Sequence, residues 1–401
     1  MASQSILWCH FYIRAHKVIS IVMKKIAFIA TAFLVAGCSR EFVEQIYDVN
    51  YEPTNRFAHN LAELPGQFEK DTDALDALIS SFSGNIQKRW GQREIKVAGK
   101  SNYVKYIDNY LSRTEVDFQK GMITIETVSP TEPQQHLKNA IITTLLTPDD
   151  PASVDLFSSK EITLEGQPFL YNQVVDQDKK PIQWSWRANR FADYLIANQV
   201  KTKDVDFKKA YYVEIPMVKD HFSQRSYQYA DIVRRASKKY DIPEDLIYAI
   251  IKTESSFNPY AVSWANAYGL MQVVPKTAGR DVFKLVKNRS GQPSPEYLFN
   301  PENNIDTGTA YFYILKNRYL KDVQHPTSLE YSMISAYNGG TGGVLNTFYR
   351  KDRKRAMRDL NALQPNQVYW ALTKKHPKTE ARRYLEKVTN FKKEFNAEHT
   401  L

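Results

Sequence analysis

The spacing of apolar residues changes once along this chain of 401 residues, near residue 220. Before that point, several short segments alternate apolar and polar residues, which is typical of β-strands with one buried face. These segments are residues 95–97, 116–118, 122–128, 161–175 and 211–215. From Tyr227 onward, apolar residues recur at helical spacing. The change predicts an α+β domain over residues 58–220, followed by an all-α domain over residues 221–401.

Helices are expected in both domains. In the first domain, apolar spacing predicts helices over residues 60–88 and 135–146, with a proline-containing turn at 130–133. In the second domain, it predicts helices over residues 243–258, 306–320, 328–337 and 381–395. The chain is longer than the ~150 residues of one typical domain, which agrees with a division into two.

The N-terminal region carries a pattern for export and processing. Residues 23–25 (Met-Lys-Lys) are a basic start, residues 26–35 are apolar, and residues 35–38 (Val-Ala-Gly-Cys) form a small-residue processing site. This arrangement resembles the bacterial lipobox, in which the cysteine is lipidated and becomes the first mature residue. We therefore predict a signal peptide over residues 23–37, a lipid anchor at Cys38 and a tether over residues 38–57.

The length of the apolar run decides between two explanations of this region. A short transmembrane or core helix is the other explanation for residues 26–35, but that run is too short to cross ~30 Å of hydrocarbon. Residues 1–22 precede a methionine that already starts a complete signal, so we expect them to be an upstream extension. The residue after Cys38 is Ser39 and not an aspartate. In this class of lipoprotein, that implies sorting to the outer membrane, with the protein facing the periplasm. The other cysteine is Cys9, so no disulfide framework is expected in the body of the protein.

Glu254 stands out because it lies on an apolar helix face. Pro243 and two acidic residues predict the start of its helix, and residues 258–259 (Asn-Pro) predict its end. Ile250 and Ile251 precede Glu254 by four and three positions and share its face. Burial and the negative end of the helix dipole both favour a carboxyl that stays protonated near neutral pH, as a general acid must. The alternative is a glutamate that bends out to solvent at a frayed helix end.

Two further motifs follow Glu254 and Ser255 along the chain. They are residues 269–272 (Gly-Leu-Met-Gln) and residues 336–340 (Ala-Tyr-Asn-Gly-Gly). These motifs in this order resemble the lysozyme-like lytic transglycosylases, which cleave bacterial cell-wall glycan. The similarity extends over the chain except for about the first 22 residues, and it implies a lysozyme-like fold for residues 221–401.

The resemblance implies a single carboxyl that serves both chemical steps. Glu254 would protonate the glycosidic oxygen and then take a proton from the C6 hydroxyl of the same muramic acid, whose attack on C1 gives a 1,6-anhydro product. The implied substrate-binding residues are Ser263, Met271, Gln272, Tyr337, Asn338 and Tyr384. For Met271 and Tyr384 the alternative is core packing, and for Ser263 it is an ordinary loop position.

Other acids and other function classes stay open at this point. Asp281 and Asp306 are the nearest downstream acids of note, and we expect Asp306 to face solvent or to pair within its helix. Phe257 and Tyr268 are aromatic candidates for stacking on sugar rings. A hydrolytic muramidase would need a water-activating acid, and a wall-binding lipoprotein would use Glu254 only structurally. The α+β domain shows no catalytic constellation, so we expect it to supply no catalytic group.

Charge and composition agree with a cell-wall enzyme and exclude other classes. The net charge of +10 suits cell-wall carboxylates or a phospholipid surface. Nucleic acid would suit that charge too, but no nucleic-acid motif appears, and the signal segment excludes the compartment. The eight histidines show no ligand spacing, so neither a metal nor a cofactor is expected. The expected partners are peptidoglycan glycan strands and, through Cys38, a membrane.

Overall fold

The protein is described by a computed structural model that covers residues 82–398, except residues 157, 264 and 265. The expected upstream extension, signal peptide, Cys38 anchor and tether lie outside the described residues, as does most of the helix predicted over residues 60–88. Residues 82–90, which include the end of that helix, are helical. Within the described part, no helix is both long enough and apolar enough to cross a membrane.

The N-terminal part is built on a five-stranded antiparallel sheet in the order β1-β2-β3-β5-β4. The strands are β1 (Asn102–Ile107), β2 (Ser112–Asp117), β3 (Met122–Thr127), β4 (Lys201–Val205) and β5 (Lys208–Pro216). In β3, Ile123 and Ile125 are completely buried, and Ile123 is opposite Ile215 of β5. The strands predicted around residues 116–118, 122–128 and 211–215 are therefore confirmed, whereas β1 and β4 were not predicted.

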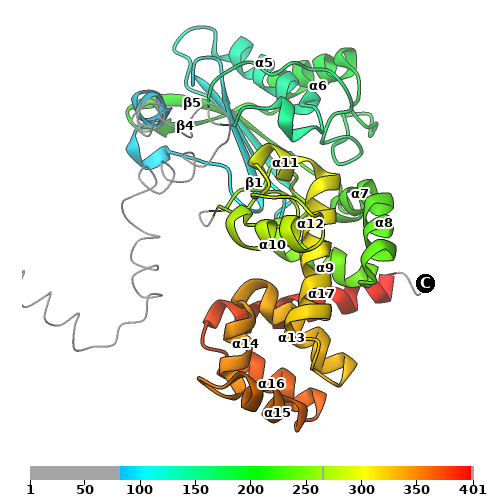
Figure 1. Ribbon diagram of the computed structural model, residues 1–401. Helices are drawn as coiled ribbons and strands as arrows, with labels where there is room; N and C mark the ends of the chain where they lie inside the picture. Colours follow the sequence, from blue (N-terminus) through cyan, green and yellow to red (C-terminus); the bar gives the residue numbers. More distant parts are fainter. Residues whose placement is uncertain (1–81, 157, 264–265, 399–401) are drawn as a thin grey trace, which may run out of the picture. The chain divides into compact units, whose positions relative to one another are not determined.

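Two helices pack together against this sheet. They are α5 (Pro133–Leu146), which confirms the helix predicted over residues 135–146, and α6 (Ser185–Asn198), which was not predicted (Figure 1). Leu137 and Ile141 of α5 are completely buried with Ile123 and Ile125 in one hydrophobic core. The N-terminal part is thus α+β, as its sequence predicts.

Two of the predicted strands are wrong. Residues 95–97 have no regular structure, because the tyrosine hydroxyl of Tyr106 takes up both backbone groups of Lys96: it accepts from the Lys96 amide and donates to the Lys96 carbonyl, each at 3.1 Å. Residues 161–175 form only isolated bridges, such as Pro148 with Pro168. Gly166 has a φ of 91° and Pro168 has no amide hydrogen, and both interrupt a strand.

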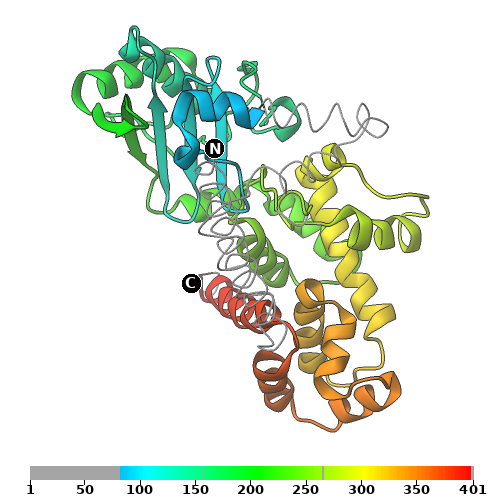
Figure 2. The same cartoon turned by 90° about the vertical axis from the view of Figure 1, so that its left-hand side faces the viewer.

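The C-terminal part is helical throughout, which confirms the prediction (Figure 2). Its helices are α7 (His221–Gln228), α8 (Ala230–Tyr240), α9 (Glu244–Ser255), α10 (Arg280–Leu285), α11 (Pro295–Phe299), α12 (Pro301–Ile314), α13 (Pro326–Gly339), α14 (Thr341–Phe348), α15 (Arg353–Asn361), α16 (Pro365–Lys375) and α17 (Thr379–Glu398). Short π-helical turns occur at Pro275–Gly279 and Leu315–Tyr319. The long helix α17 packs against both α9 and α13.

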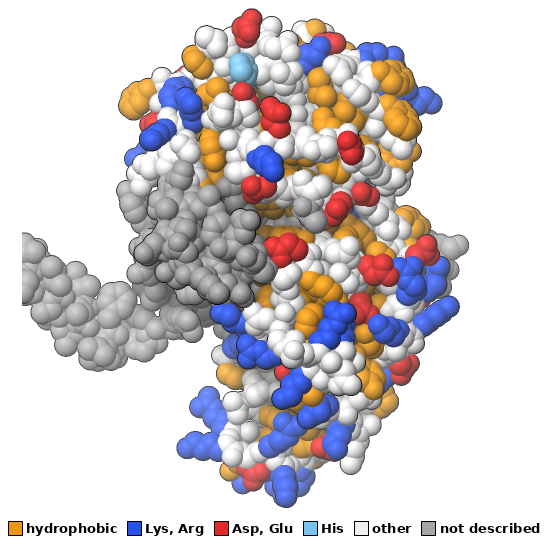
Figure 3. Space-filling view, turned by 45° about the horizontal axis from the view of Figure 1, so that its top comes forward, with side chains coloured by type: hydrophobic (Ala, Val, Ile, Leu, Met, Phe, Trp, Pro, Cys, Tyr) orange, Lys and Arg blue, Asp and Glu red, His pale blue; other side chains and the backbone are white. Residues whose placement is uncertain are grey.

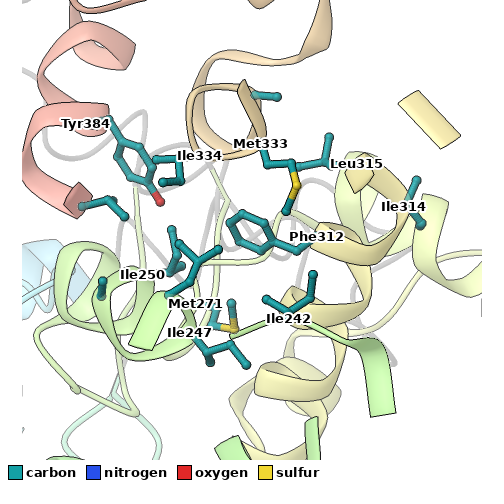
Figure 4. Packing of buried hydrophobic residues seen from close by; sticks show 14 of the residues in the cluster. Ile242, Ile247, Ile250, Met271, Phe312, Ile314, Leu315, Met333, Ile334 and Tyr384 are labelled. Carbon is teal, nitrogen blue, oxygen red and sulfur yellow. The ribbon is translucent and has the colours of Figure 1, made fainter. Parts of the chain in front are cut away.

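A single large hydrophobic core holds these helices together. Ile247 and Ile250 of α9 lie beside Met271, with Phe312 of α12 across from them (Figure 4). All four side chains are completely buried. Tyr384 enters from α17 at the edge of this cluster, and its hydroxyl points inward (Figure 4). The core therefore fixes α9, α12 and α17 relative to one another.

Tyr260 connects the C-terminal part to the core of the N-terminal part. Its ring lies 5.0 Å from that of Tyr103 and 5.5 Å from that of Phe169, measured between centroids. Its hydroxyl donates to the carbonyl oxygen of Pro148 at 2.5 Å. Because Tyr260 is completely buried there, the segment after α9 is part of the hydrophobic core of the N-terminal domain.

Arg225 of α7 makes a second connection between the two parts. It donates to the carbonyl oxygens of Phe118 and Ser256 and to the side-chain oxygen of Gln173. Its side chain is almost completely buried. Most other basic residues in the described part are exposed. In the view of Figure 3, many Lys and Arg side chains lie toward the lower end of the molecule.

Candidate active site

Glu254 lies in the last turn of α9, where the sequence places it. Glu244 and Asp245 occupy the first turn, and the helix ends where Ser256 and Phe257 adopt positive φ angles of 54° and 61°. The Glu254 side chain is only 6% exposed, although it ends in a carboxyl group. The expected burial of Glu254 on an apolar face is therefore confirmed, and the frayed-end alternative is wrong.

Four influences act on the Glu254 carboxyl. Burial raises its pKa above the ordinary value and is the strongest of them. The ammonium of Lys100, with Nζ 3.2 Å from Oε2, and the hydroxyl of Tyr384 act in the opposite direction and lower the pKa. The weakest influence is the like charge of Glu380, which raises the pKa. The net effect is a raised pKa, which favours the protonated form that a general acid needs.

A pocket of about 330 Å³ opens at Glu254. It is lined by residues from the turn before β1, from the end of β2, from the end of α9 and from α17. They are Lys100, Ser101, Gln119, Thr253, Glu254, Ser255, Ser256, Glu380, Arg383, Tyr384 and Lys387. The four α17 residues in this set are spaced by three, four and seven positions, so they share one helix face. Two carboxyls and three basic groups therefore surround the same space.

The loop after α9 is held by a buried asparagine. Asn304 Oδ1 accepts from the Met271 amide at 2.8 Å, and its Nδ2 donates to the carbonyl oxygens of Tyr268 and Leu298, each at 2.7 Å. Gly269 approaches Asn304 so closely, and at a φ of 71°, that a side chain there would collide with it. Residues 269–272 thus form a rigid turn. The sequence motif alone does not reveal this rigidity, because Asn304 lies outside the motif.

This turn is hydrogen-bonded directly to the end of α9. The hydroxyl of Ser255 donates to the carbonyl oxygen of Leu270 at 2.8 Å. The side-chain amide of Gln272 donates to the carbonyl oxygens of Ala261 and Gly269. The end of α9 and the turn at residues 269–272 therefore form one hydrogen-bonded unit.

Helix α13 supplies Tyr337 and Asn338 at its C-terminal end. The Tyr337 hydroxyl donates to the Met271 carbonyl oxygen at 2.8 Å, and its ring stacks on Phe312 at 4.6 Å. The Asn338 side chain donates to Glu380 Oε1 at 3.2 Å. Tyr337 thus supports the turn at residues 269–272, while Asn338 contacts a residue that lines the pocket.

Two of the predicted substrate-binding residues carry a buried oxygen without a protein partner. Among the described residues, Gln272 Oε1 and Asn338 Oδ1 have no hydrogen bond. Buried polar groups are nearly always paired in folded proteins, and exceptions require an explanation. The Tyr384 hydroxyl acts on the Glu254 carboxyl, and of these three residues Tyr384 is the one that lines the pocket.

The other predicted residues lie deeper in the protein. Met271 is completely buried in the core, as its alternative reading allowed, so its contact with substrate stays a prediction. Ser263 is buried in its loop, where its hydroxyl accepts from the Ala267 amide at 3.2 Å. Phe257 and Tyr268 are also buried, at 0% and 2% exposure, so the expectation that they stack on sugars is wrong. Both rings pack against neighbouring aromatic side chains instead.

The two other candidate acids have structural partners. Asp306 accepts from the Tyr240 hydroxyl at 2.9 Å and pairs with Lys239 at 2.7 Å and with Lys287. The expectation that it faces solvent or pairs within its own helix is wrong, because these partners come from other elements. Asp281 accepts from the Tyr319 hydroxyl at 2.9 Å. Neither acid lines the pocket at Glu254.

Most of the pocket residues were missed from the sequence, and Glu380 and Lys100 are the two of them that contact predicted site residues. Glu380 is a second carboxyl in the pocket, and only its spacing of four from Tyr384 could have indicated it. Lys100 comes from the N-terminal part, which was expected to contribute nothing, and no motif marks it. Within the described residues no cluster of His, Cys, Asp and Glu could hold a metal ion.

Known proteins match both parts of the chain. The family model for the N-terminal domain of membrane-bound lytic murein transglycosylase C matches residues 68–228, and the model for the transglycosylase SLT domain matches residues 231–359. The 70 kDa soluble lytic transglycosylase of Escherichia coli, a solved structure, is 28% identical over 41% of this chain and 23% of its own, with a TM-score of 0.31. That score does not by itself establish a shared fold.

Full-length relatives are closer. A membrane-bound lytic murein transglycosylase C from Photorhabdus laumondii is 50% identical over 336 residues, which are 84% of this chain and 94% of that protein. The protein of the same name from Serratia proteamaculans is 50% identical over 327 residues, 81% of this chain and 91% of its own. The resemblance seen in the sequence motifs is confirmed: this chain belongs to the family of membrane-bound lytic murein transglycosylase C.

Proposed function

We propose that this protein is a lytic transglycosylase that cleaves the β-1,4 bond between N-acetylmuramic acid and N-acetylglucosamine in peptidoglycan, during turnover and remodelling of the cell wall. The observation that carries the proposal is Glu254, a buried carboxyl of raised pKa at a pocket. Its relatives are named for this activity. No cofactor enters the chemistry.

The reaction proceeds in two proton transfers through one carboxyl. Glu254 gives its proton to the glycosidic oxygen as the bond to C1 breaks. The carboxylate then takes the proton of the C6 hydroxyl while the C6 oxygen bonds to C1, which forms the 1,6-anhydro ring and restores the acid. An internal nucleophile has a high effective molarity, so water need not be activated.

The remaining site residues bind and orient the glycan. Gln272 and Asn338 each have a buried oxygen that the described protein leaves unpaired, and Tyr384 lines the pocket beside Glu254. Tyr337 holds the turn that carries Gln272, through the Met271 carbonyl oxygen. Ser263 and Met271 are assigned to the same site on the strength of the family motif.

The relatives are named membrane-bound, and we assign that property here to a lipid at Cys38. The signal pattern over residues 23–37 supports this assignment. Ser39, which follows the cysteine, supports a location at the outer membrane, with the enzyme facing the periplasm. The Cys38→Ser variant should leave the membrane fraction. A variant that still sediments with membranes would contradict the anchor.

Product analysis tests the reaction. The wild-type protein should release muropeptides that end in 1,6-anhydro-muramic acid and lack one water, as measured by mass spectrometry. Glu254→Gln should lose at least about 10²–10⁴-fold in rate, because it removes both proton transfers. Turnover within about tenfold of wild type would refute the assignment of Glu254.

A hydrolytic muramidase is the second candidate, and Glu380 is the observation that favours it. Glu380 lies in the same pocket, is exposed, and sits in the first turn of α17. A second carboxyl there could activate water, as in glycosidases that use two carboxyls. Incorporation of ¹⁸O from labelled water into the new reducing ends, abolished by Glu380→Gln, would identify this route.

A further inference from the structure

Lys100 reaches the catalytic carboxyl from a different domain. It lies in a bend of the chain just before β1, and its Nζ is 3.2 Å from Glu254 Oε2. The Lys100 side chain is 44% exposed, whereas that of Glu254 is 6% exposed. The partly exposed Lys100 side chain thus places its ammonium against the buried carboxyl of Glu254.

The backbone of Lys100 is fixed against the end of α9. Asn258, completely buried and four positions after Glu254, places its side-chain nitrogen 3.3 Å from the Lys100 carbonyl oxygen and 3.4 Å from those of Gly99 and Asn102. The Gly99 amide closes the bend by donating to the Asn102 carbonyl oxygen at 3.0 Å. The position of the ammonium therefore follows from backbone contacts, and does not depend on the ion pair alone.

The two proton transfers place opposite demands on Glu254. Before bond cleavage the carboxyl must be neutral, and after it the same group is a buried anion beside an electron-poor sugar. A buried charge without a partner is costly. A cation at one carboxyl oxygen offsets that cost, and it leaves Oε1 to exchange the proton with the glycan.

Other charged and titratable groups around Glu254 have different positions. Tyr337 of α13 contacts the turn at residues 269–272, and from α17 Glu380 adds a like charge, while Arg383 and Lys387 line the pocket. Among the described residues, Lys100 is the cation that forms an ion pair with Glu254. It is thus the group best placed to hold the carboxylate.

We propose that Lys100 is a positioning residue for the reaction: the N-terminal domain inserts its ammonium at Glu254 Oε2, where it orients the carboxyl and stabilises the anion between the two proton transfers. This inference rests on the proposed role of Glu254. The proton given to the glycosidic oxygen and the one taken from the C6 hydroxyl are both carried by Glu254.

The test compares Lys100→Met with Lys100→Arg in the full chain, on purified peptidoglycan. Lys100→Met should lower kcat by about 10²-fold, the scale of a misplaced catalytic group, with KM changed by less than about threefold. Lys100→Arg keeps the charge and should retain kcat within about tenfold of wild type. Lys201→Met is the matched control, since Lys201 pairs with Glu214 at 2.7 Å on the sheet and does not line the pocket.

A pH profile distinguishes positioning from a structural defect. Lys100 lowers the pKa of Glu254, so its removal raises that pKa. Because the acid works when protonated, the alkaline limb of kcat/KM should move to higher pH in Lys100→Met and stay in place in Lys100→Arg and Lys201→Met.

Two results would overturn the proposal. One is Lys100→Met with kcat within about threefold of wild type and an unmoved alkaline limb. The other is that Lys100→Met and Lys100→Arg lose activity to the same extent and also have equally lowered thermal midpoints. Such a defect would not depend on the charge of residue 100. If the wild-type protein released no anhydro products, the proposed function would fail instead, and that result is visible without any Lys100 variant.

Discussion

Gly269→Ala tests whether the turn at residues 269–272 is as rigid as its contacts indicate. Gly269 has a φ of 71°, which costs roughly 1–2 kcal/mol for an alanine. A Cβ at this position would lie 2.4 Å from Asn304 Nδ2 and 2.5 Å from the Leu298 carbonyl oxygen. Neither atom can move freely, because the two are hydrogen-bonded to each other at 2.7 Å.

The size of the effect follows from the bonds that must break. Displacing Asn304 weakens its three buried hydrogen bonds, to the Met271 amide and to the carbonyl oxygens of Tyr268 and Leu298, each worth roughly 1 kcal/mol. Together with the backbone cost, we expect Gly269→Ala to lose about 3–5 kcal/mol of unfolding free energy. At ~2–4 °C per kcal/mol, the thermal midpoint should fall by about 6–20 °C.

Urea unfolding and thermal scans of the variant and wild type measure this loss. Gly342→Ala is the control, since a Cβ on Gly342 meets no atom within 4 Å and the residue lies in α14, where alanine is favoured by up to about 1 kcal/mol. A loss below about 1 kcal/mol in Gly269→Ala, or one equal to that of Gly342→Ala, would refute the view that Asn304 locks the turn.

Three further variants probe the site and its support. Tyr384→Phe removes a buried hydroxyl that acts on the Glu254 carboxyl but makes no hydrogen bond of ordinary geometry, so thermal stability should change little while kcat falls; a fall in stability with normal kcat would contradict a role at the reaction centre. Tyr260→Ala should lose about 3–5 kcal/mol in urea unfolding, and a variant as stable as wild type would show that the two domains are held by other contacts. Burial, aided by the Arg225 charge, lowers the pKa of His221 to about 4 from 6.5, so the unfolded chain gains a proton between these pH values and the folded one does not. Stability should therefore fall by at most roughly 3 kcal/mol as the pH drops from 6.5 to 4, and His221→Gln should flatten that dependence; an identical pH dependence in the variant would refute it.

The local pattern of the sequence predicted the elements in which buried and less buried residues recur with a regular period. Strand β3 alternates between partly buried and buried residues from Met122 to Ile125. Helix α9 buries Ile247, Ile250 and Glu254, while Tyr248 and Lys252 stay partly exposed. Strand β1 was missed because both of its faces are covered: Tyr103 lies in the core under α5 and α6, while Val104 lies in a second cluster with the helix at residues 82–90. A strand buried on both faces shows no alternation.

The site was predictable only where a motif carries it. Glu254 lies where its helix face predicts, and Tyr384 lines the same pocket. Lys100 is 154 positions from Glu254 and belongs to another domain, so the contact depends on how the two domains pack, which no local pattern encodes. Phe257 shows the converse limit, since an aromatic residue beside a catalytic motif looks the same in sequence whether it faces a ligand or the core.

The burial of Tyr260 among N-terminal residues also has a consequence for how the protein is made. Synthesis proceeds from the N-terminus, so the last strand of the sheet, ending at Pro216, emerges 44 residues before Tyr260 does (260 minus 216). Until then, Tyr103 and Phe169 lack the ring that packs against both of them. The N-terminal domain therefore cannot complete its core alone, and a nascent chain stalled before Tyr260 should bind chaperones at this gap. The segment that directly follows α9 is therefore needed to complete the core under the sheet.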